Sequence, residues 1–278
     1  MGSRLILLGT GVPTPNLQRG SACSALVRGD RITLIDCGHG AVHGLLRAGL
    51  DPLHLDEIFF THHHFDHNID FPYLVLSGWI MGRDFPVRVY GPKGTAKFVG
   101  SVFNTFEIDI ACRLETGVQT TVGLDFRAQD IDEGFATEGP WRVRCRRVEH
   151  LKQLGNYTLG YRFESEDGSV AFSGDTKPCD AVVDLARGAN ILVHECFYSP
   201  EFEETGMVQG RNKAHPKLPA IHSSPEEVGA IATRAGVKRL VLTHLWTERD
   251  LDVLWKRIRR TFNGEILVGH DGMMISLE

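Results

Sequence analysis

Short apolar runs recur along the chain, and most of them end at Gly, Asp or His. The first three runs, at residues 4–8, 24–27 and 31–35, predict strands because each is a short apolar stretch bounded by turn-forming residues. Gly29-Asp30, between the second and the third run, predicts a hairpin turn. The N-terminal part of the chain is therefore expected to open with a sheet.

After this sheet, apolar runs alternate with stretches of helical periodicity. The expected order is a helix at 39–48, a strand at 57–60, a helix at 68–80, a strand at 87–90, a helix at 93–106, strands within 122–173, a helix at 179–186, a strand at 191–194, a helix at 225–235, a strand at 239–243, a helix at 250–261 and strands to residue 277. Two successive β-then-α halves predict two sheets packed face to face with helices outside. Neither a repeat nor a Ser/Gly linker divides the chain, so a single domain over residues 1–278 is expected.

Composition and charge narrow the class of protein. With 278 residues, 42 % hydrophobic content and ordinary Gly and Pro usage, the sequence excludes disordered, collagen-like and coiled-coil chains. The apolar residues 5–8 are too few for a signal-peptide core or a membrane span, so a cytoplasmic location without membrane attachment is the default expectation. Six cysteines without a C-x-x-C pair predict neither a disulfide framework nor a cysteine zinc site. The net charge of −5 argues mildly against a polyanion such as nucleic acid as the main partner, and a local basic face is left open.

The stretch THHHFDH at residues 61–67 concentrates metal-ligand chemistry directly after an apolar run. Imidazole nitrogens and carboxylates are the ligands that zinc, manganese and iron(II) accept. The candidates in this stretch are His62, His64, Asp66 and His67. Four ligands from one short loop cannot close around a single ion without strain, so two ions completed from elsewhere are expected. Further candidates at the ends of three other predicted strands are His150, Asp175 and His244.

Eight stretches in order resemble the metallo-β-lactamase superfamily over essentially the whole chain, and most specifically its tRNase Z branch with the arylsulfatase-like and phosphodiesterase-like relatives. They are Leu8-Gly9-Thr10-Gly11-Val12-Pro13, Ile35-Asp36-Cys37-Gly38, the stretch THHHFDH, Ser173-Gly174-Asp175-Thr176, Val193-His194-Glu195, His222-Ser223-Ser224, Leu242-Thr243-His244 and Asp271-Gly272-Met273. The resemblance implies an α/β fold, the αββα four-layer sandwich. The implied ligands are His62, His64 and His150 for one ion, Asp66, His67 and His244 for the other, and Asp175 as the bridge.

Two ions bridged by a carboxylate can share a water and lower its pKa, which gives a hydroxide nucleophile for hydrolysis. Zinc is the expected ion, with manganese and iron as alternatives, because ligand type biases the metal without fixing it. Redox relatives with this fold have Glu at the position of His64, so an oxygen-reducing diiron site is disfavoured. Asp66 and His222 are the expected catalytic residues. The tRNase Z pattern places His222 beside the metals at the entrance of a helix, which suits an anion.

Other residues are expected to support the ligands or to line the substrate pocket. Asp36, His194 and Glu195 are expected to orient ligands through hydrogen bonds. The candidates for the pocket wall are Phe65, Trp79, Phe197 and Trp246, with core packing as the alternative for the two tryptophans. Residues 197–221 contain several Pro and Gly residues and no periodicity, which predicts a loop that covers the metal cleft.

The chain departs from the family pattern in three places, of which the long segment 197–221 is one. The bacterial tRNase Z pattern has a long protruding arm, which grips the tRNA, between the third metal histidine and the bridging aspartate. Here two predicted strands and their turns fill the segment between His150 and Asp175. Phe65 stands where the family usually has a small residue, and an aromatic side chain at the mouth favours a small organic substrate. The alternating arginines Arg142, Arg144 and Arg146 lack interleaved aromatics and are interpreted as a solvated strand face.

The leading hypothesis is therefore a dinuclear metal-dependent hydrolase of a small, anionic ester, of the phosphodiester or aryl sulfate type. Its expected partner is a small-molecule ester, without nucleic acid or membrane, and a homodimer is left open. The alternatives are a tRNA 3′-processing endonuclease, a hydrolase of lactones or other carbonyl esters, and a non-catalytic binding or sensor protein. The last is disfavoured because every expected ligand is present. The hypothesis predicts no tRNA processing at a physiological rate.

Overall fold

Two seven-stranded sheets form the centre of the structure, a computed structural model that describes residues 2–150, 157–205 and 217–277. In spatial order, the strands of the first sheet are β14 (Met274–Ser276), β1 (Arg4–Gly9), β2 (Cys23–Arg28), β3 (Arg31–Ile35), β4 (Leu55–Phe59), β5 (Val87–Gly91) and β6 (Phe126–Asp130). Those of the second are β13 (Glu265–Val268), β12 (Arg239–Thr243), β11 (Ile191–Glu195), β10 (Gly168–Phe172), β9 (Thr158–Ser165), β8 (Arg142–Val148) and β7 (Ala136–Glu138). Strands β3 to β6 and β10 to β13 run parallel, and the remaining pairs are antiparallel.

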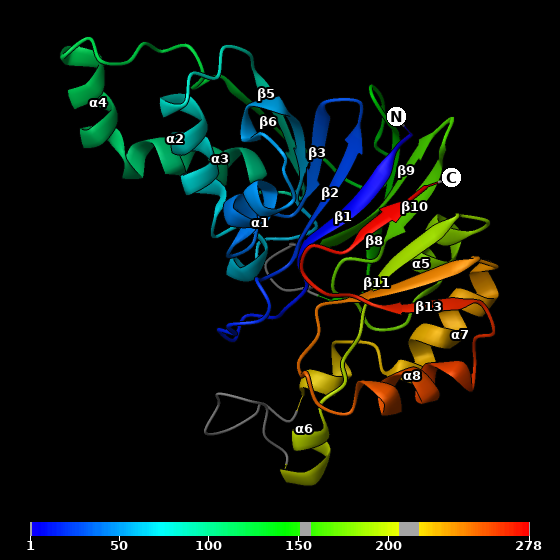
Figure 1. Cartoon of the computed structure of the whole chain (residues 1–278). Coiled ribbons are helices and arrows are strands. Elements are labelled where there is room, and N and C mark those ends of the chain that lie inside the picture. Colours follow the sequence, from blue (N-terminus) through cyan, green and yellow to red (C-terminus); the bar gives the residue numbers. More distant parts are fainter. Residues whose placement is uncertain (1, 151–156, 206–216, 278) are drawn as a thin grey trace.

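Helices cover the outer faces of both sheets (Figure 1). Those beside the first sheet are α1 (Ala41–Arg47), α2 (Phe71–Ile80) and α3 (Thr95–Thr105), whereas α4 (Glu107–Glu115) projects away from this sheet. Those beside the second sheet are α5 (Asp180–Ala186), α7 (Pro225–Ala235) and α8 (Leu251–Arg259), while α6 (Pro200–Thr205) projects away from the sheets. This arrangement confirms the αββα sandwich that the sequence predicts. Among the described helices, none is long and apolar enough to span a membrane.

Three apolar layers hold the sheets and helices together. In β1, Leu5 and Leu7 pack between the two sheets, whereas Ile6 faces the helices of the first sheet. A third layer joins the second sheet to α5, α7 and α8. Because these strands are buried on both faces, their sequences are continuous apolar runs. At the centre of the layer between the sheets, the ring of Phe59 meets that of Phe163 edge-on at a centroid distance of 5.1 Å.

The two sheets are also hydrogen-bonded to each other at one edge. The N–H of Leu159 donates to the carbonyl of Thr61 (2.8 Å), and the hydroxyl of Tyr161 donates to the carbonyl of Phe60 (2.6 Å). The loops that follow β4, β8, β10 and β12 begin at this edge. Carboxyl ends of parallel strands are where such folds present functional groups, and the fold therefore gathers the candidate ligands here.

Most predicted elements are present with shifted ends. The strands at 31–35 and 239–243 and the helix at 225–235 have the predicted bounds. The helix expected from Asn68 begins at Phe71, because residues 65–67 form a 3-10 helix and Pro72 occupies the first turn of α2. The apolar pattern does not predict α4, which has no buried residue. Within the predicted loop 197–221 lies α6, and residues 206–216 are outside the described residues.

We expect Phe59→Ala to lower the free energy of unfolding by about 3 to 5 kcal/mol, because it opens a cavity between the sheets. Ile108→Ala is the control, since Ile108 is 83 % exposed and its truncation should change stability by less than about 0.5 kcal/mol. Denaturant unfolding of the metal-loaded proteins measures both. Equal stability of the two variants would show that the sheet-to-sheet layer is not the main source of stability.

Candidate metal centre

The loop after β4 folds tightly at the edge of the sheets. His64 is extended, and the 3-10 helix Phe65–His67 follows it, with the N–H of His67 donating to the carbonyl of His64 (3.1 Å). This single turn brings Asp66 and His67 to the buried side and leaves Phe65 58 % exposed. The turn therefore directs its two candidate ligands to the buried side, while the bulky apolar residue of the turn points to solvent.

One group of ligand atoms gathers around His64. The Nε2 atom of His62 lies 2.9 Å from Nδ1 of His64, and Nε2 of His150 lies 3.5 Å from the same atom. Both Nε2 atoms are 3.8 Å from Oδ2 of Asp175. The chain thus brings together the four residues of the first predicted set, although they come from three separate loops.

A second group shares Asp175 with the first. Nε2 of His67 lies 3.5 Å from Oδ2 of Asp66 and 3.5 Å from Oδ1 of Asp175. Nε2 of His244 lies 3.4 Å from Oδ2 of both aspartates. Asp175 therefore contacts members of both groups, which is the position that the sequence predicts for a bridge.

These separations fit divalent metal ions. Atoms that each lie about 2.1 Å from one tetrahedral ion are about 3.4 Å from one another. Most of the observed separations are 3.4 to 3.8 Å, and the one between His62 and His64 is shorter, at 2.9 Å. Burial lowers the pKa of His62, His64 and His150, which keeps their imidazoles neutral and able to donate a lone pair. The donor set of imidazole nitrogens and carboxylate oxygens matches zinc, manganese or iron.

Hydrogen bonds on the far side of each ring fix which nitrogen faces the centre. His62 Nδ1 donates to the hydroxyl of Thr61 (3.0 Å), and His150 Nδ1 donates to the carbonyl of Ile221 (2.9 Å). With the proton held on Nδ1, the Nε2 lone pair of each ring is free to bind an ion. Sequence reasoning missed both partners, and a backbone carbonyl such as that of Ile221 carries no sequence signal.

Asp36 holds the whole loop in place, as expected. Its carboxylate accepts hydrogen bonds from the N–H of Thr61 (2.7 Å), from the hydroxyl of Thr61 (2.9 Å) and from Nδ1 of His67 (2.8 Å). Burial by itself lowers the pKa of His67, but the charges of Asp175, Asp36 and Asp66 raise it well above its usual value. Asp36 and His244 both adopt left-handed backbone (φ 61° and 54°), a costly conformation that the site retains.

His222 lies beside the two groups, directly before α7. Its Nδ1 is 2.9 Å from Oε1 of Glu195, which also accepts from the N–H of Thr176 (2.9 Å). Glu195 thereby positions His222 and the backbone next to Asp175. Burial lowers the pKa of His222, but the charge and hydrogen bond of Glu195 raise it to about 9. An atom each of His222, Asp175 and His244 lie within 4.8 Å of one another.

Aromatic side chains form one wall beside His222. The ring of Phe197 stacks on that of His222 at a centroid distance of 6.1 Å, and Trp246 lies edge-on to it at 5.8 Å. Phe202 of α6 and Leu218 pack against the same cluster. Both described ends of residues 197–221 therefore lie close to the metal centre, while the middle of the predicted cover falls outside the described residues.

Two predicted site residues lie elsewhere. Trp79, expected in the pocket wall, is fully buried near the end of α2, where its indole N–H donates to the carbonyl of Thr120 (2.7 Å). The apolar pattern of α2 buries this side chain, so the wall assignment is wrong. His194, expected to orient a ligand, has Nδ1 at 2.6 Å from the carbonyl of Glu195, and its Nε2 has no hydrogen-bond partner among the described residues. Its place inside β11 directs it away from the strand end.

Comparisons with known proteins agree with this geometry. The Beta-lactamase superfamily domain matches residues 31–245. The chain belongs to the metallo-β-lactamase superfamily. It is 31 % identical over 274 residues to the Ribonuclease Z of Mycobacterium bovis (strain BCG / Pasteur 1173P2), covering 96 % of this chain and 95 % of that protein. Superfamily membership makes it a metal-dependent hydrolase of ester bonds, of the tRNase Z-like branch.

Solved structures of the superfamily share the fold. The metallo-beta-lactamase fold protein YhfI from Bacillus subtilis superposes with a TM-score of 0.75 at 20 % identity, over 99 % of each chain. The short form of human tRNase Z superposes with a TM-score of 0.69 at 22 % identity, also over 99 % of each chain. At such low sequence identity, the superpositions show only that the sandwich fold is shared. The substrate has to be inferred from the site.

We expect Asp175→Ala to remove metal from both groups, because its carboxylate contacts both, whereas Asp66→Ala should remove metal from one. Elemental analysis after dialysis measures the ions per chain. Asp252→Ala, in an exposed part of α8, is the control and should keep the wild-type content. Identical metal content in the two site variants would contradict the shared position of Asp175.

Proposed function

We propose that the protein cleaves RNA precursors at their 3′ end as an endonuclease of the ribonuclease Z type, using two divalent metal ions. The observation that carries the proposal is the end-to-end match to a protein named Ribonuclease Z, on a chain that retains every candidate ligand and His222 in one site. A phosphodiester is an anionic ester, so the proposal keeps the predicted chemistry and changes the size of the substrate.

The ligand groups have distinct parts in this chemistry. His62, His64 and His150 would hold one ion, and Asp66, His67 and His244 the other, with Asp175 between them. When bound, the ions neutralise the phosphate and supply an activated water. Burial opposes ionisation of Asp66, but the charges of His67 and His244 lower its pKa, so it stays a carboxylate that can orient this water. The water oxygen bonds to phosphorus as the bond from phosphorus to the 3′ oxygen breaks.

His222 is the proposed general acid. Its Nδ1 proton is held by Glu195, so a proton on Nε2 faces the centre and can pass to the departing 3′ oxygen. The products are then a 3′ hydroxyl and a 5′ phosphate. Glu195 acts through His222 and is a positioning residue.

Neither the missing arm nor the net negative charge excludes a nucleic-acid substrate. The Mycobacterium bovis relative aligns over 95 % of its own length with almost no additional residues, so it has no room for a long arm either. A net charge of −5 describes the whole surface and permits a local basic face. The expectation that nucleic acid is an unlikely partner is therefore replaced.

A second candidate is hydrolysis of a small phosphodiester at the same centre. The observation that favours it is the aromatic cluster of Phe197 and Trp246 beside His222, together with the exposed Phe65 within the ligand loop. Apolar walls with a few convergent polar groups are typical of small-molecule pockets. Both candidates use the same ligands, so only the substrate separates them.

We expect the metal-loaded protein to cleave precursor tRNA with kcat/KM at least about 100-fold above that for bis(p-nitrophenyl) phosphate, because RNA adds binding energy away from the reacting bond. An aryl sulfate and a lactone, assayed in parallel, should be turned over more slowly still. Efficient hydrolysis of the small diester with no site-specific RNA cleavage would reverse the ranking of the two candidates.

We expect His222→Gln to lower kcat for RNA by about 100- to 10,000-fold, since an alkoxide leaves poorly without a proton. The same substitution should lower hydrolysis of bis(p-nitrophenyl) phosphate by less than about tenfold, because p-nitrophenolate leaves without protonation. Metal content, measured on the same samples, should be unchanged. Equal losses on both substrates would contradict the role of His222 as general acid.

A further inference from the structure

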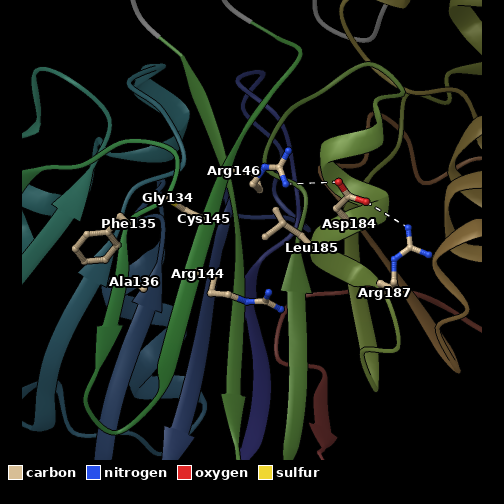
Figure 2. Close-up of a pocket in the computed structure, with 9 residues that line it drawn as sticks. All are labelled: Gly134, Phe135, Ala136, Arg144, Cys145, Arg146, Asp184, Leu185 and Arg187. Carbon is tan, nitrogen blue, oxygen red and sulfur yellow. Dashed lines mark hydrogen bonds and ion pairs between the residues drawn. The ribbon is translucent and has the colours of Figure 1, made fainter.

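A separate pocket of about 380 Å³ opens on the outer face of the second sheet, between β7, β8 and the end of α5. Figure 2 shows three guanidinium groups around it, those of Arg144, Arg146 and Arg187. Asp184 stands between two of them, and the apolar side chain of Leu185 lies among the charged groups. None of these residues belongs to the metal centre.

Two of the arginines are already partly neutralised. Arg146 lies 3.5 Å from Oδ2 of Asp184 and also pairs with Glu133. Arg187 lies 3.3 Å from the other oxygen of Asp184. A carboxylate between two guanidinium groups holds both side chains in position while each keeps unused N–H donors.

Arg144 differs from its neighbours because it has no carboxylate partner among the described residues. Its cross-strand partner in the register of β8 and β9 is another arginine, Arg162, whose own charge is met by Glu164. Like charges directly opposite each other on one face of a sheet are destabilising. The exposed guanidinium of Arg144 is therefore able to accept an anionic partner from outside the described chain.

The outer face of the second sheet around β8 differs in the sign of its charge from the whole chain. Among the described side chains that line the pocket or pair with its arginines on the outer side of β8, there are five arginines and three carboxylates: Arg142, Arg144, Arg146, Arg162, Arg187, Glu133, Glu164 and Asp184. The excess is positive, although the complete sequence has a net charge of −5. Arg142 and Arg144 are exposed, as the prediction of a solvated strand face requires, and the ion pairs of the described residues leave a surplus of positive charge on this face.

Strand β8 connects the pocket to the metal centre. This strand ends two residues before His150, so Arg146 and Arg144 lie on the order of 13 and 20 Å along the chain from that ligand at about 3.3 Å per residue. A few nucleotides next to the scissile bond span such a distance. A chain that lacks a protruding arm can therefore still contact the substrate backbone beyond the reacting bond.

We propose that the pocket at Arg144, Arg146 and Arg187 binds phosphate groups of the RNA backbone on the β8 side of the metal centre. The inference rests on the proposed function and adds where the substrate is held. Planar guanidinium groups form paired hydrogen bonds with phosphate oxygens. The phosphate would form an ion pair with Arg144. Such contacts position the RNA without reading its sequence.

The test measures binding of fluorescently labelled precursor tRNA by anisotropy over a range of salt concentrations. All proteins carry His222→Gln, so that bound RNA is cleaved slowly. Arg144→Ala and Arg187→Ala should each weaken RNA binding about three- to tenfold and reduce the slope of log affinity against log salt by about one. Arg144→Lys, which keeps the charge, should retain most of the slope. Without the His222 change, Arg144→Ala should leave hydrolysis of bis(p-nitrophenyl) phosphate unchanged.

Arg127→Ala is the matched control, because it removes one exposed, ion-paired arginine from β6 on the other sheet. If Arg144→Ala and Arg187→Ala bind RNA as Arg127→Ala does, the site is refuted. Displacement of RNA by millimolar inorganic phosphate, with an unchanged salt slope in Arg144→Ala, would assign the pocket to a free anion and overturn the RNA assignment. Arg144-dependent RNA binding without RNA cleavage by the wild-type protein would support the site and refute the proposed function.

Discussion

The burial of several carboxylates among imidazoles at one edge of the sandwich is the constraint on which the site depends. Asp36, Asp66 and Asp175 are all nearly inaccessible to solvent. Removing an ionised carboxylate from water costs several kcal/mol unless it is paired and hydrogen-bonded. Hydrogen bonds from Thr61 and His67 offset this cost for Asp36, whereas Asp66 has only a long hydrogen bond of 3.4 Å with Nε2 of His244, and Asp175 faces ring nitrogens at 3.4 to 3.8 Å. Divalent cations bound between these carboxylates and the facing imidazoles would neutralise the buried negative charge.

The two packed sheets make this arrangement possible, because a charged cluster needs a frame that cannot relax around it. Hydrogen bonds from Leu159 and Tyr161 to the strand end at Phe60 and Thr61 tie the sheets together directly above the ligands. Close packing of the layer between the sheets keeps that frame rigid. The ligand loop itself is short and has one turn of 3-10 helix, so its geometry follows from the strand end that precedes it.

Much of the architecture and of the ligand set could be predicted from the sequence, since both rest on local signals. Continuous apolar runs identify strands buried on both faces, and a His or Asp at the end of such a run identifies a group at the sheet edge. The partners of the ligands were harder to find: the carbonyl of Ile221 carries no side-chain signal, and the inward direction of Trp79 depends on how α2 packs. His194 shares a motif with Glu195, but adjacent residues of a strand point to opposite faces, so only Glu195 reaches His222.

The size of the substrate is the property that the sequence pattern indicates least well, for a physical reason. A missing arm, a negative total charge and an aromatic residue at the mouth each describe one feature of the molecule, whereas polyanion binding depends on how charges are distributed over the surface. The alternating arginines of β8 look like an ordinary solvated face in sequence. The register adds information, because it sets Arg144 opposite Arg162 on the strand that leads to His150, and Arg144 has no carboxylate partner in the described parts of the chain. In the proposed binding mode a phosphate of the RNA backbone would supply that counter-ion, whereas a small ester bound at the metals would not reach it.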